Sequence, residues 1–113
     1  MIELKAIVQP FQLNQVIEAL QQIEGLPGVT VSEVRGFGRA RAANAKDTVV
    51  DGSIVYARKA KLEIVIPERL LDVVLQTILD KARTGNPGDG KIFISKVIDV
   101  VRIRTGARGE AAI

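Results

Sequence analysis

Apolar and polar residues alternate along the first strand-like segment of the chain, from Ile2 to Val8. This two-residue period is typical of a β-strand with one buried face. After Pro10 the spacing becomes helical, which predicts a helix whose apolar face carries Leu13, Val16, Ile17, Leu20 and Ile23. A second strand is predicted over residues 29–34, running into Gly36-Phe37-Gly38.

The same order recurs in the second half of the chain. Alternation over residues 60–66 predicts a third strand, and Pro67 suits the first turn of the helix that follows. The apolar face of that helix would carry Leu70, Leu71, Val74, Leu75, Ile78 and Ala82. A glycine-rich turn is expected over 84–90. Residues 92–104 are predicted as the last strand, with an irregularity near Ser95-Lys96, where the alternation shifts phase.

Residues 39–58, between the two halves, show no sustained periodicity. We interpret them as a long loop with a hairpin at Asp51-Gly52, and loops of this length usually have a function. The order βαβ, loop, βαβ predicts one α+β domain over residues 1–113, a ferredoxin-like βαββαβ sandwich. Its antiparallel sheet would carry both helices on one face. The uncovered face would include Ile7 and Val65, so we expect self-association.

Composition narrows the possible chemistry. The 113 residues include neither cysteine nor histidine, which excludes disulfides, thiolate metal sites and the usual general base. The apolar content of 47% and charged content of 26% are those of an ordinary soluble domain. Signal-peptide features and a span-length apolar run are both lacking, so we expect a cytoplasmic protein. The net charge of +3 favours anionic partners.

Three short patches combine glycines with basic residues. They are Gly36-Phe37-Gly38-Arg39, the segment from Thr84-Gly85 to Gly88-Asp89-Gly90-Lys91, and Arg102-Ile103-Arg104-Thr105-Gly106. The first is by itself more often a simple turn. In the second, backbone amides could converge on an anion beside Lys91, although a helix-to-strand turn with a solvated lysine would look the same. In the third, two arginines on one face of a strand could fork a polyphosphate, or could protect a sheet edge.

In order and spacing, the three patches resemble the PII signal-transduction family, and the similarity covers essentially the whole chain. The segments Ile7-Val8-Gln9-Pro10-Phe11-x-Leu13 and Ala111-Ala112-Ile113 match as well. The resemblance implies a homotrimer that binds ATP or ADP in clefts between subunits. It also implies a regulator, not an enzyme, that contacts a target enzyme or membrane transporter through a mobile loop, here residues 38–59, in nitrogen regulation.

The resemblance further assigns the nucleotide-binding residues. Thr30 and Val65 would flank the adenine, and Arg102 and Arg104 would reach the phosphates from the neighbouring subunit. The whole expected set is Ile7, Thr30, Gly36, Phe37, Gly38, Arg39, Ala40, Lys59, Glu63, Val65, Gly88, Asp89, Gly90, Lys91, Arg102, Ile103 and Arg104.

The loop differs from that of other members at two positions. Ala40 stands where they carry a glutamine that helps bind Mg²⁺ and 2-oxoglutarate. Alanine supplies no oxygen ligand, so we expect weakened Mg²⁺ binding, no dedicated metal site and little response to 2-oxoglutarate. Gly52 stands where many bacterial members carry a modified tyrosine, so no modification is expected there. Tyr56 is expected to pack at the base of the loop.

Two other function classes use the same fold. A nucleic-acid-binding domain is the main alternative, but it needs stacking aromatic residues, and the chain has only Phe11, Phe37, Tyr56 and Phe93. A small hydrolase would have to position a water molecule without histidine or cysteine. A slow ATPase activity in the nucleotide cleft is compatible with the same residues.

Overall fold

The computed structural model describes residues 1–38 and 48–113. The strands are β1 (Ile2–Val8), β2 (Thr30–Gly36), β3 (Thr48–Asp51), β4 (Ile54–Ile66) and β5 (Gly90–Lys96). The helices are α1 (Leu13–Gln21) and α2 (Leu71–Ala82), and short 3-10 turns lie at Pro10–Gln12, Glu68–Leu70 and Glu110–Ala112.

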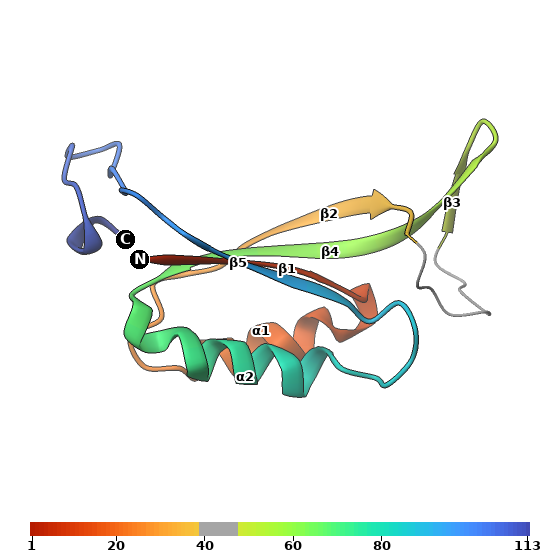
Figure 1. Cartoon of the computed structure of the whole chain (residues 1–113), viewed down its shortest axis with the longest axis horizontal. Helices are drawn as coiled ribbons and strands as arrows, with labels where there is room; N and C mark the ends of the chain where they lie inside the picture. Colours follow the sequence, from red (N-terminus) through yellow and green to blue (C-terminus); the bar gives the residue numbers. More distant parts are fainter. Residues whose placement is uncertain (39–47) are drawn as a thin grey trace.

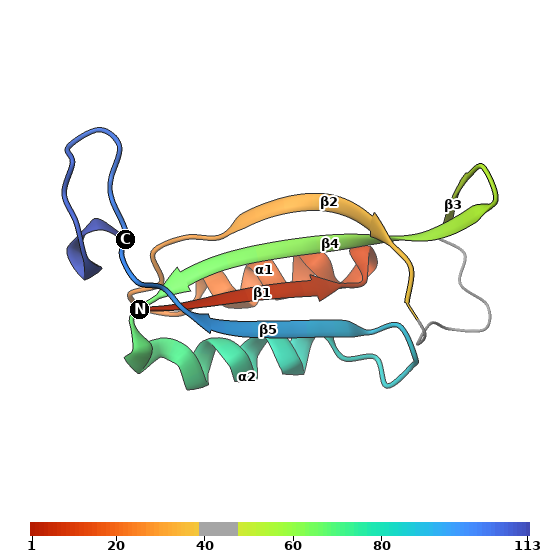
Figure 2. The same ribbon diagram turned by 45° about the horizontal axis from the view of Figure 1, so that its top comes forward.

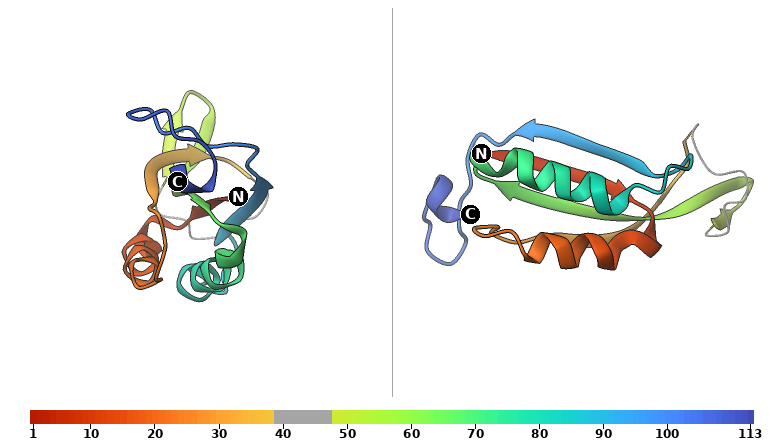
Figure 3. Two further views of the ribbon diagram at one scale, coloured as in Figure 1. Left: turned by 90° about the vertical axis from the view of Figure 1, so that its left-hand side faces the viewer. Right: turned by 90° about the horizontal axis from the view of Figure 1, so that it is seen from below.

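The strands form one antiparallel sheet in the order β2-β4-β1-β5, with β3 paired to β4. Both helices lie on the same face of this sheet (Figures 1 and 3). The α+β ferredoxin-like sandwich expected from the sequence is therefore confirmed. The two strand-to-helix junctions are also alike. Each begins with a 3-10 bond, from Gln12 N to Gln9 O at 3.0 Å and from Leu70 N to Pro67 O at 3.0 Å. A second follows in each, from Leu13 N to Pro10 O and from Leu71 N to Glu68 O.

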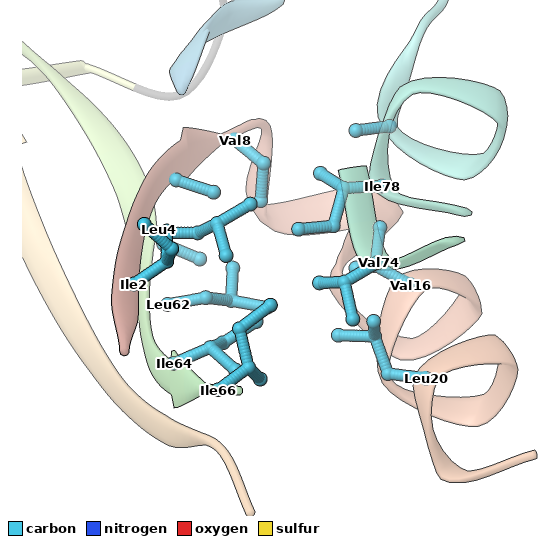
Figure 4. Close-up of a cluster of buried hydrophobic side chains, with 13 residues drawn as sticks. Ile2, Leu4, Val8, Val16, Leu20, Leu62, Ile64, Ile66, Val74 and Ile78 are labelled. Carbon is cyan, nitrogen blue, oxygen red and sulfur yellow. The ribbon is translucent and has the colours of Figure 1, made fainter. Parts of the chain in front are cut away.

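The core lies between the sheet and the two helices. Alternate residues of β1 and β4 point towards the helices and are buried, as the two-residue period predicts. Figure 4 shows these side chains meeting the apolar faces of α1 and α2. The residues labelled there are Ile2, Leu4, Val8, Val16, Leu20, Leu62, Ile64, Ile66, Val74 and Ile78.

The opposite face of the sheet has no helix over it. Ile7 and Val65 lie on this open face, as expected, and both are half-buried. Charged residues share the face with them, including Lys61 and Glu63, whose side chains form an ion pair at 3.2 Å. The open face is thus more polar than Ile7 and Val65 alone suggested.

The prediction of a last strand over 92–104 is wrong beyond Lys96. β5 pairs with β1, and its last partner is Ile2, the first residue of β1. One further bond joins Val97 N to Met1 O at 3.0 Å, after which no neighbouring strand remains. The phase shift at Ser95-Lys96 therefore marks the end of the strand. The chain then turns away from the sheet (Figure 2).

The interpretation of residues 39–58 as one long loop is also wrong in part. Thr48–Asp51 and Ile54–Arg58 are strand residues of β3 and β4, so the third strand begins six residues earlier than expected. The expected hairpin is present, with Gly52 and Ser53 as its turn residues. It projects beyond the end of β2 (Figure 1).

In the ranges 1–38 and 48–113, no helix is long and apolar enough to cross a membrane.

Candidate functional site: a pocket at the end of the sheet

A pocket of about 400 Å³ lies at one end of the sheet, where β1 and β2 end and β5 begins. It joins two of the three glycine-containing patches, which lie far apart in the sequence, at 36–39 and 84–91. Its lining consists of Ile7, Gly36, Phe37, Gly38, Ala57, Lys59, Asn86, Gly88, Asp89, Gly90, Lys91 and Phe93. Nine of the expected nucleotide-binding residues are therefore brought together: Ile7, Gly36, Phe37, Gly38, Lys59, Gly88, Asp89, Gly90 and Lys91.

The strand register explains this convergence. Ile7 lies opposite Lys91 in the β1–β5 pair, and Gly36 lies opposite Ala57 in the β2–β4 pair. The turn over 84–90 delivers the chain to the start of β5 at the same end of the sheet. The strand pairing therefore brings together two patches that lie far apart in the sequence.

The turn over 84–90 is held by the carboxylate of Asp89. This carboxylate accepts hydrogen bonds from Thr84 N at 2.8 Å, from Gly85 N at 2.9 Å and from the Thr84 hydroxyl. Partial burial opposes ionisation, but these bonds and the nearby Lys59 charge outweigh it and lower the pKa of Asp89 below 3.8. The ionised carboxylate fixes the turn, because its oxygens accept the donors of the turn itself.

The carbonyl of Gly88 ties the same turn to the sheet. It accepts a hydrogen bond from Gln9 Nε2 at 2.7 Å and another from Lys59 Nζ. Gly88 and Gly90 have φ values of +94° and +102°, in the left-handed region that favours glycine. The Gly88 carbonyl is therefore held by two donors, one from Gln9, the residue after β1, and one from Lys59 in β4.

The pocket combines two cations with aromatic and apolar side chains. Lys59 and Lys91 supply positive charge, and Phe37 and Phe93 are exposed beside Ile7. The ring of Phe37 lies 6.1 Å from that of Tyr56, so Tyr56 packs at the base of the hairpin as expected. Such a lining suits a ligand that has both a negatively charged part and a flat, less polar part.

A second group of expected residues lies elsewhere in this chain. Val65 is opposite Glu3, near the start of β1, and Thr30 is opposite Glu63, which is level with the middle of β1, so these positions lie on the open face outside the pocket. The segment with Arg102, Ile103 and Arg104 follows β5 and lies beyond the end of the sheet where β1 begins (Figure 2). β5 continues for three residues beyond Phe93, about 10 Å at ~3.3 Å per residue, and residues 97–101 follow before Arg102. One chain does not bring the two groups together.

The strand argument for the two arginines does not hold. Arg102 and Arg104 lie in a turn, where Arg102 N donates to Ala107 O at 2.8 Å and Gly106 N donates to Arg102 O at 2.7 Å. The arginine pair is therefore not on one face of a strand. The Arg102 guanidinium instead donates to the main-chain oxygen of Ile113 at 3.3 Å. Arg39 and Ala40 lie outside the described residues.

Three lining residues of the pocket were missing from the expected set, Ala57, Asn86 and Phe93. Gln9, which is not part of the lining but holds the Gly88 carbonyl, was missing as well. Phe93 could have been found, because it is two residues from Lys91 and therefore on the same face of a strand. Gln9, Ala57 and Asn86 depend on the packing of the turn against the sheet, which gives no local pattern. No cluster of three potential metal ligands (His, Cys, Asp or Glu) occurs in the part of the chain that the structure describes.

Comparison with known proteins identifies the family. The family model described as Nitrogen regulatory protein P-II matches residues 1–107. The chain is 42% identical to Nitrogen regulatory protein P-II 1 of Escherichia coli K12 and 45% identical to Nitrogen regulatory protein P-II of Synechocystis, in both cases over all 113 residues and the full length of the relative. A crystal structure of Arabidopsis thaliana PII bound to citrate superposes with a TM-score of 0.79 at 44% identity, covering 99% of this chain and 91% of the other. The chain therefore belongs to the nitrogen regulatory protein P-II family.

Proposed function

We propose that this P-II protein binds ATP or ADP and regulates a target enzyme or transporter by contact, without catalysing a reaction itself. The observation that carries the proposal is the pocket that joins Gly36-Phe37-Gly38 to the segment Gly88–Lys91. Phosphate groups would lie against Lys91 and the main chain of 88–90, because glycine-rich turns let amides approach an anion closely. The aromatic and apolar part of the lining would contact the base and ribose.

The complete site would be shared between two subunits of a homotrimer. This would explain why Val65 and the arginine-bearing turn lie towards the opposite end of the molecule, and why Thr30 and Glu63, level with the middle of β1, do not line the pocket. A neighbouring copy would supply them. Exposed apolar side chains support association: Ile98 is 99% exposed and Ile103 fully so, which is unusual for isoleucine in a monomer.

The hairpin of β3 and β4 would belong to the surface that contacts the target. It lies next to the pocket and carries exposed Val50, Ile54 and Val55 near its turn. Such residues can be buried by a partner at little cost in desolvation. Because Ala40 supplies no ligand, Mg²⁺ would add little to nucleotide affinity, and 2-oxoglutarate would add little to the response.

Calorimetry with ATP and with ADP tests the binding proposal. A nucleotide at 100 times its Kd should also stabilise the protein by about 2.7 kcal/mol, which thermal unfolding would report. Arg104→Ala should weaken binding by about 1.5–3 kcal/mol, because a charge-assisted hydrogen bond to phosphate is lost. An unchanged melting temperature in millimolar ATP or ADP would contradict the proposal.

Three additional measurements test the co-effectors and the alternative functions. Adding Mg²⁺ and then 2-oxoglutarate to the ATP titration tests the consequence expected of Ala40, and a strong increase in affinity with 2-oxoglutarate would contradict it. A single-stranded oligonucleotide tests the nucleic-acid alternative. That alternative is not favoured, since Tyr56 and Phe93 are the only aromatic residues in the described strands. Phosphate release from ATP measures any ATPase activity.

A further inference from the structure

Arg35 connects the hairpin to the neighbourhood of the pocket. Its Nη2 atom lies 3.3 Å from Oδ2 of Asp51, the residue that precedes the hairpin turn. Its guanidinium carbon also lies 5.1 Å from the centre of the Tyr56 ring. The Tyr56 ring in turn lies 6.1 Å from the Phe37 ring, at an interplanar angle of 55°. We call Arg35, Tyr56 and Phe37 the aromatic stack.

The strand register produces this arrangement. Arg35 lies opposite Arg58 in the β2–β4 pair, and Tyr56 is two residues before Arg58 on the same face of β4. Arg35 and Tyr56 are therefore diagonal neighbours, a distance that long and aromatic side chains can bridge. Asp51 pairs with Ile54 across the turn, which places its carboxylate beside the same strand. The stack thus depends on β4 continuing from the sheet into the hairpin.

Phe37 is the member of the stack that lines the pocket. It follows the last residue of β2 and is 75% exposed, so the core does not fix its ring. Among the described residues, Tyr56 makes a tilted ring contact with Phe37, and this contact can hold the Phe37 ring in place. The Arg35–Asp51 pair is itself exposed, with side-chain exposures of 50% and 64%. Contacts of this kind are individually weak, so a ligand that touches Phe37 can change their populations.

We infer that Arg35 and Tyr56 are positioning residues for the Phe37 wall of the pocket. Through them, occupation of the pocket changes the surroundings of the Tyr56 ring and the Arg35–Asp51 contact at the hairpin. The ligand class is that of the proposed function, an adenine nucleotide, and the inference rests on that function. What it adds is the set of side chains that link the pocket to the hairpin.

The chain contains a built-in reporter for this link. Tyr56 is its only tyrosine, and it has no tryptophan, so tyrosine emission arises from the stack alone. Titration with ADP, corrected for absorbance with free tyrosine, should change this emission with the same midpoint as calorimetric binding. In Arg35→Ala the ring stays as the fluorophore but loses its cation partner. The ADP-dependent change should then be reduced, while Lys81→Ala, on the exposed surface of α2, should leave it as in the wild type.

Variants at Tyr56 separate positioning from general stability. Tyr56→Ala removes the ring contact and should weaken ADP binding about 2- to 10-fold, the range of an aromatic pair. Tyr56→Phe retains the ring and should bind ADP with wild-type affinity. If the two variants have equal melting temperatures, a folding defect cannot account for the weaker binding of Tyr56→Ala.

The outcomes distinguish the inference from the function on which it rests. If ADP binds to the wild type but Tyr56 emission does not change, and Tyr56→Ala binds as tightly as Tyr56→Phe, the positioning role is wrong and nucleotide binding stands. If calorimetry detects no binding of ADP or ATP to the wild type, the proposed function fails, and this inference fails with it.

Discussion

Gly90 is the residue on which the geometry of the pocket depends most directly. A Cβ atom at this position would lie 1.7 Å from the carbonyl oxygen of Ile7 and 2.8 Å from its carbonyl carbon. Both are main-chain atoms of β1, so no side chain can move aside. The absence of a side chain at Gly90 lets β5 start close to the end of β1. That close approach places Lys91 opposite Ile7 and brings the turn over 84–90 to the pocket.

Gly90→Ala should therefore lower the free energy of unfolding by more than about 3 kcal/mol, because the clash adds to the strain of a positive φ. Urea denaturation would measure the loss. Gly85→Ala is the matched control, since Gly85 has a similar φ of +89° but open space around its Cβ position. The control should lose only about 1–2 kcal/mol, the cost of the backbone conformation. Equal losses in both variants would show that the contact with Ile7 is unimportant.

The secondary-structure elements differ in how far the sequence could predict them. β1, α1 and α2 bury one regular face, so the period of their apolar residues predicts them well. The end of β5 is set by its partner, because β1 starts at Ile2 and residues after Val97 have no strand of the sheet to pair with. The apolar, β-branched residues of 97–104 favour a strand locally, but no sheet edge is available to them. The hairpin turn was expected from Asp51-Gly52, but its strand residues Thr48-Val49-Val50 and Ile54-Val55 form runs too short to show a period.

The candidate site could likewise be predicted only where its residues form a local pattern. Each glycine-containing patch could be recognised from its own residues, and most of the pocket lining was expected. The meeting of Gly36-Phe37-Gly38 with Gly88–Lys91 depends on the order of the strands in the sheet. The role of Gln9 depends on the position of a single carbonyl, that of Gly88. Local sequence patterns carry neither kind of information.

At the level of the elements, β4 is the strand that links the core, the pocket and the hairpin, and Leu62 is at its centre. Leu62 is fully buried beneath the helices, opposite Ala6 on one side and Val31 on the other. Leu62→Ala should destabilise the fold by about 2–5 kcal/mol through lost burial and the cavity left behind. The control is Val31→Ala, one strand away and 42% exposed, which should cost much less. Chemical denaturation of both would test this, and equal losses would contradict the position of the core.

For the whole molecule, the expected site residues fall into two groups, one in the pocket at one end of the sheet and the other from the middle of the open face to the turn beyond the far end. One end has the pocket with Lys91, and the other leads to the turn with Arg104. If copies associate so that the pocket of one meets the arginine-bearing turn of the next, three copies can close a ring with equivalent sites. Light scattering should then report about three times the chain mass of 12.2 kDa. A monomer mass at all concentrations would rule out a shared site.

Mixing two defective variants tests directly whether the site is shared. Lys91→Ala damages the pocket, and Arg104→Ala damages the turn expected to reach it from a neighbour, so each homotrimer should bind ATP weakly at all of its sites. In mixed trimers formed by refolding the two together, some interfaces combine the intact Lys91 of one chain with the intact Arg104 of the other. Random assortment makes these about a quarter of the sites in an equal mixture. Calorimetry should therefore recover that fraction of wild-type sites at wild-type affinity. A site built within a single chain would recover none, because each chain in the mixture carries one lesion.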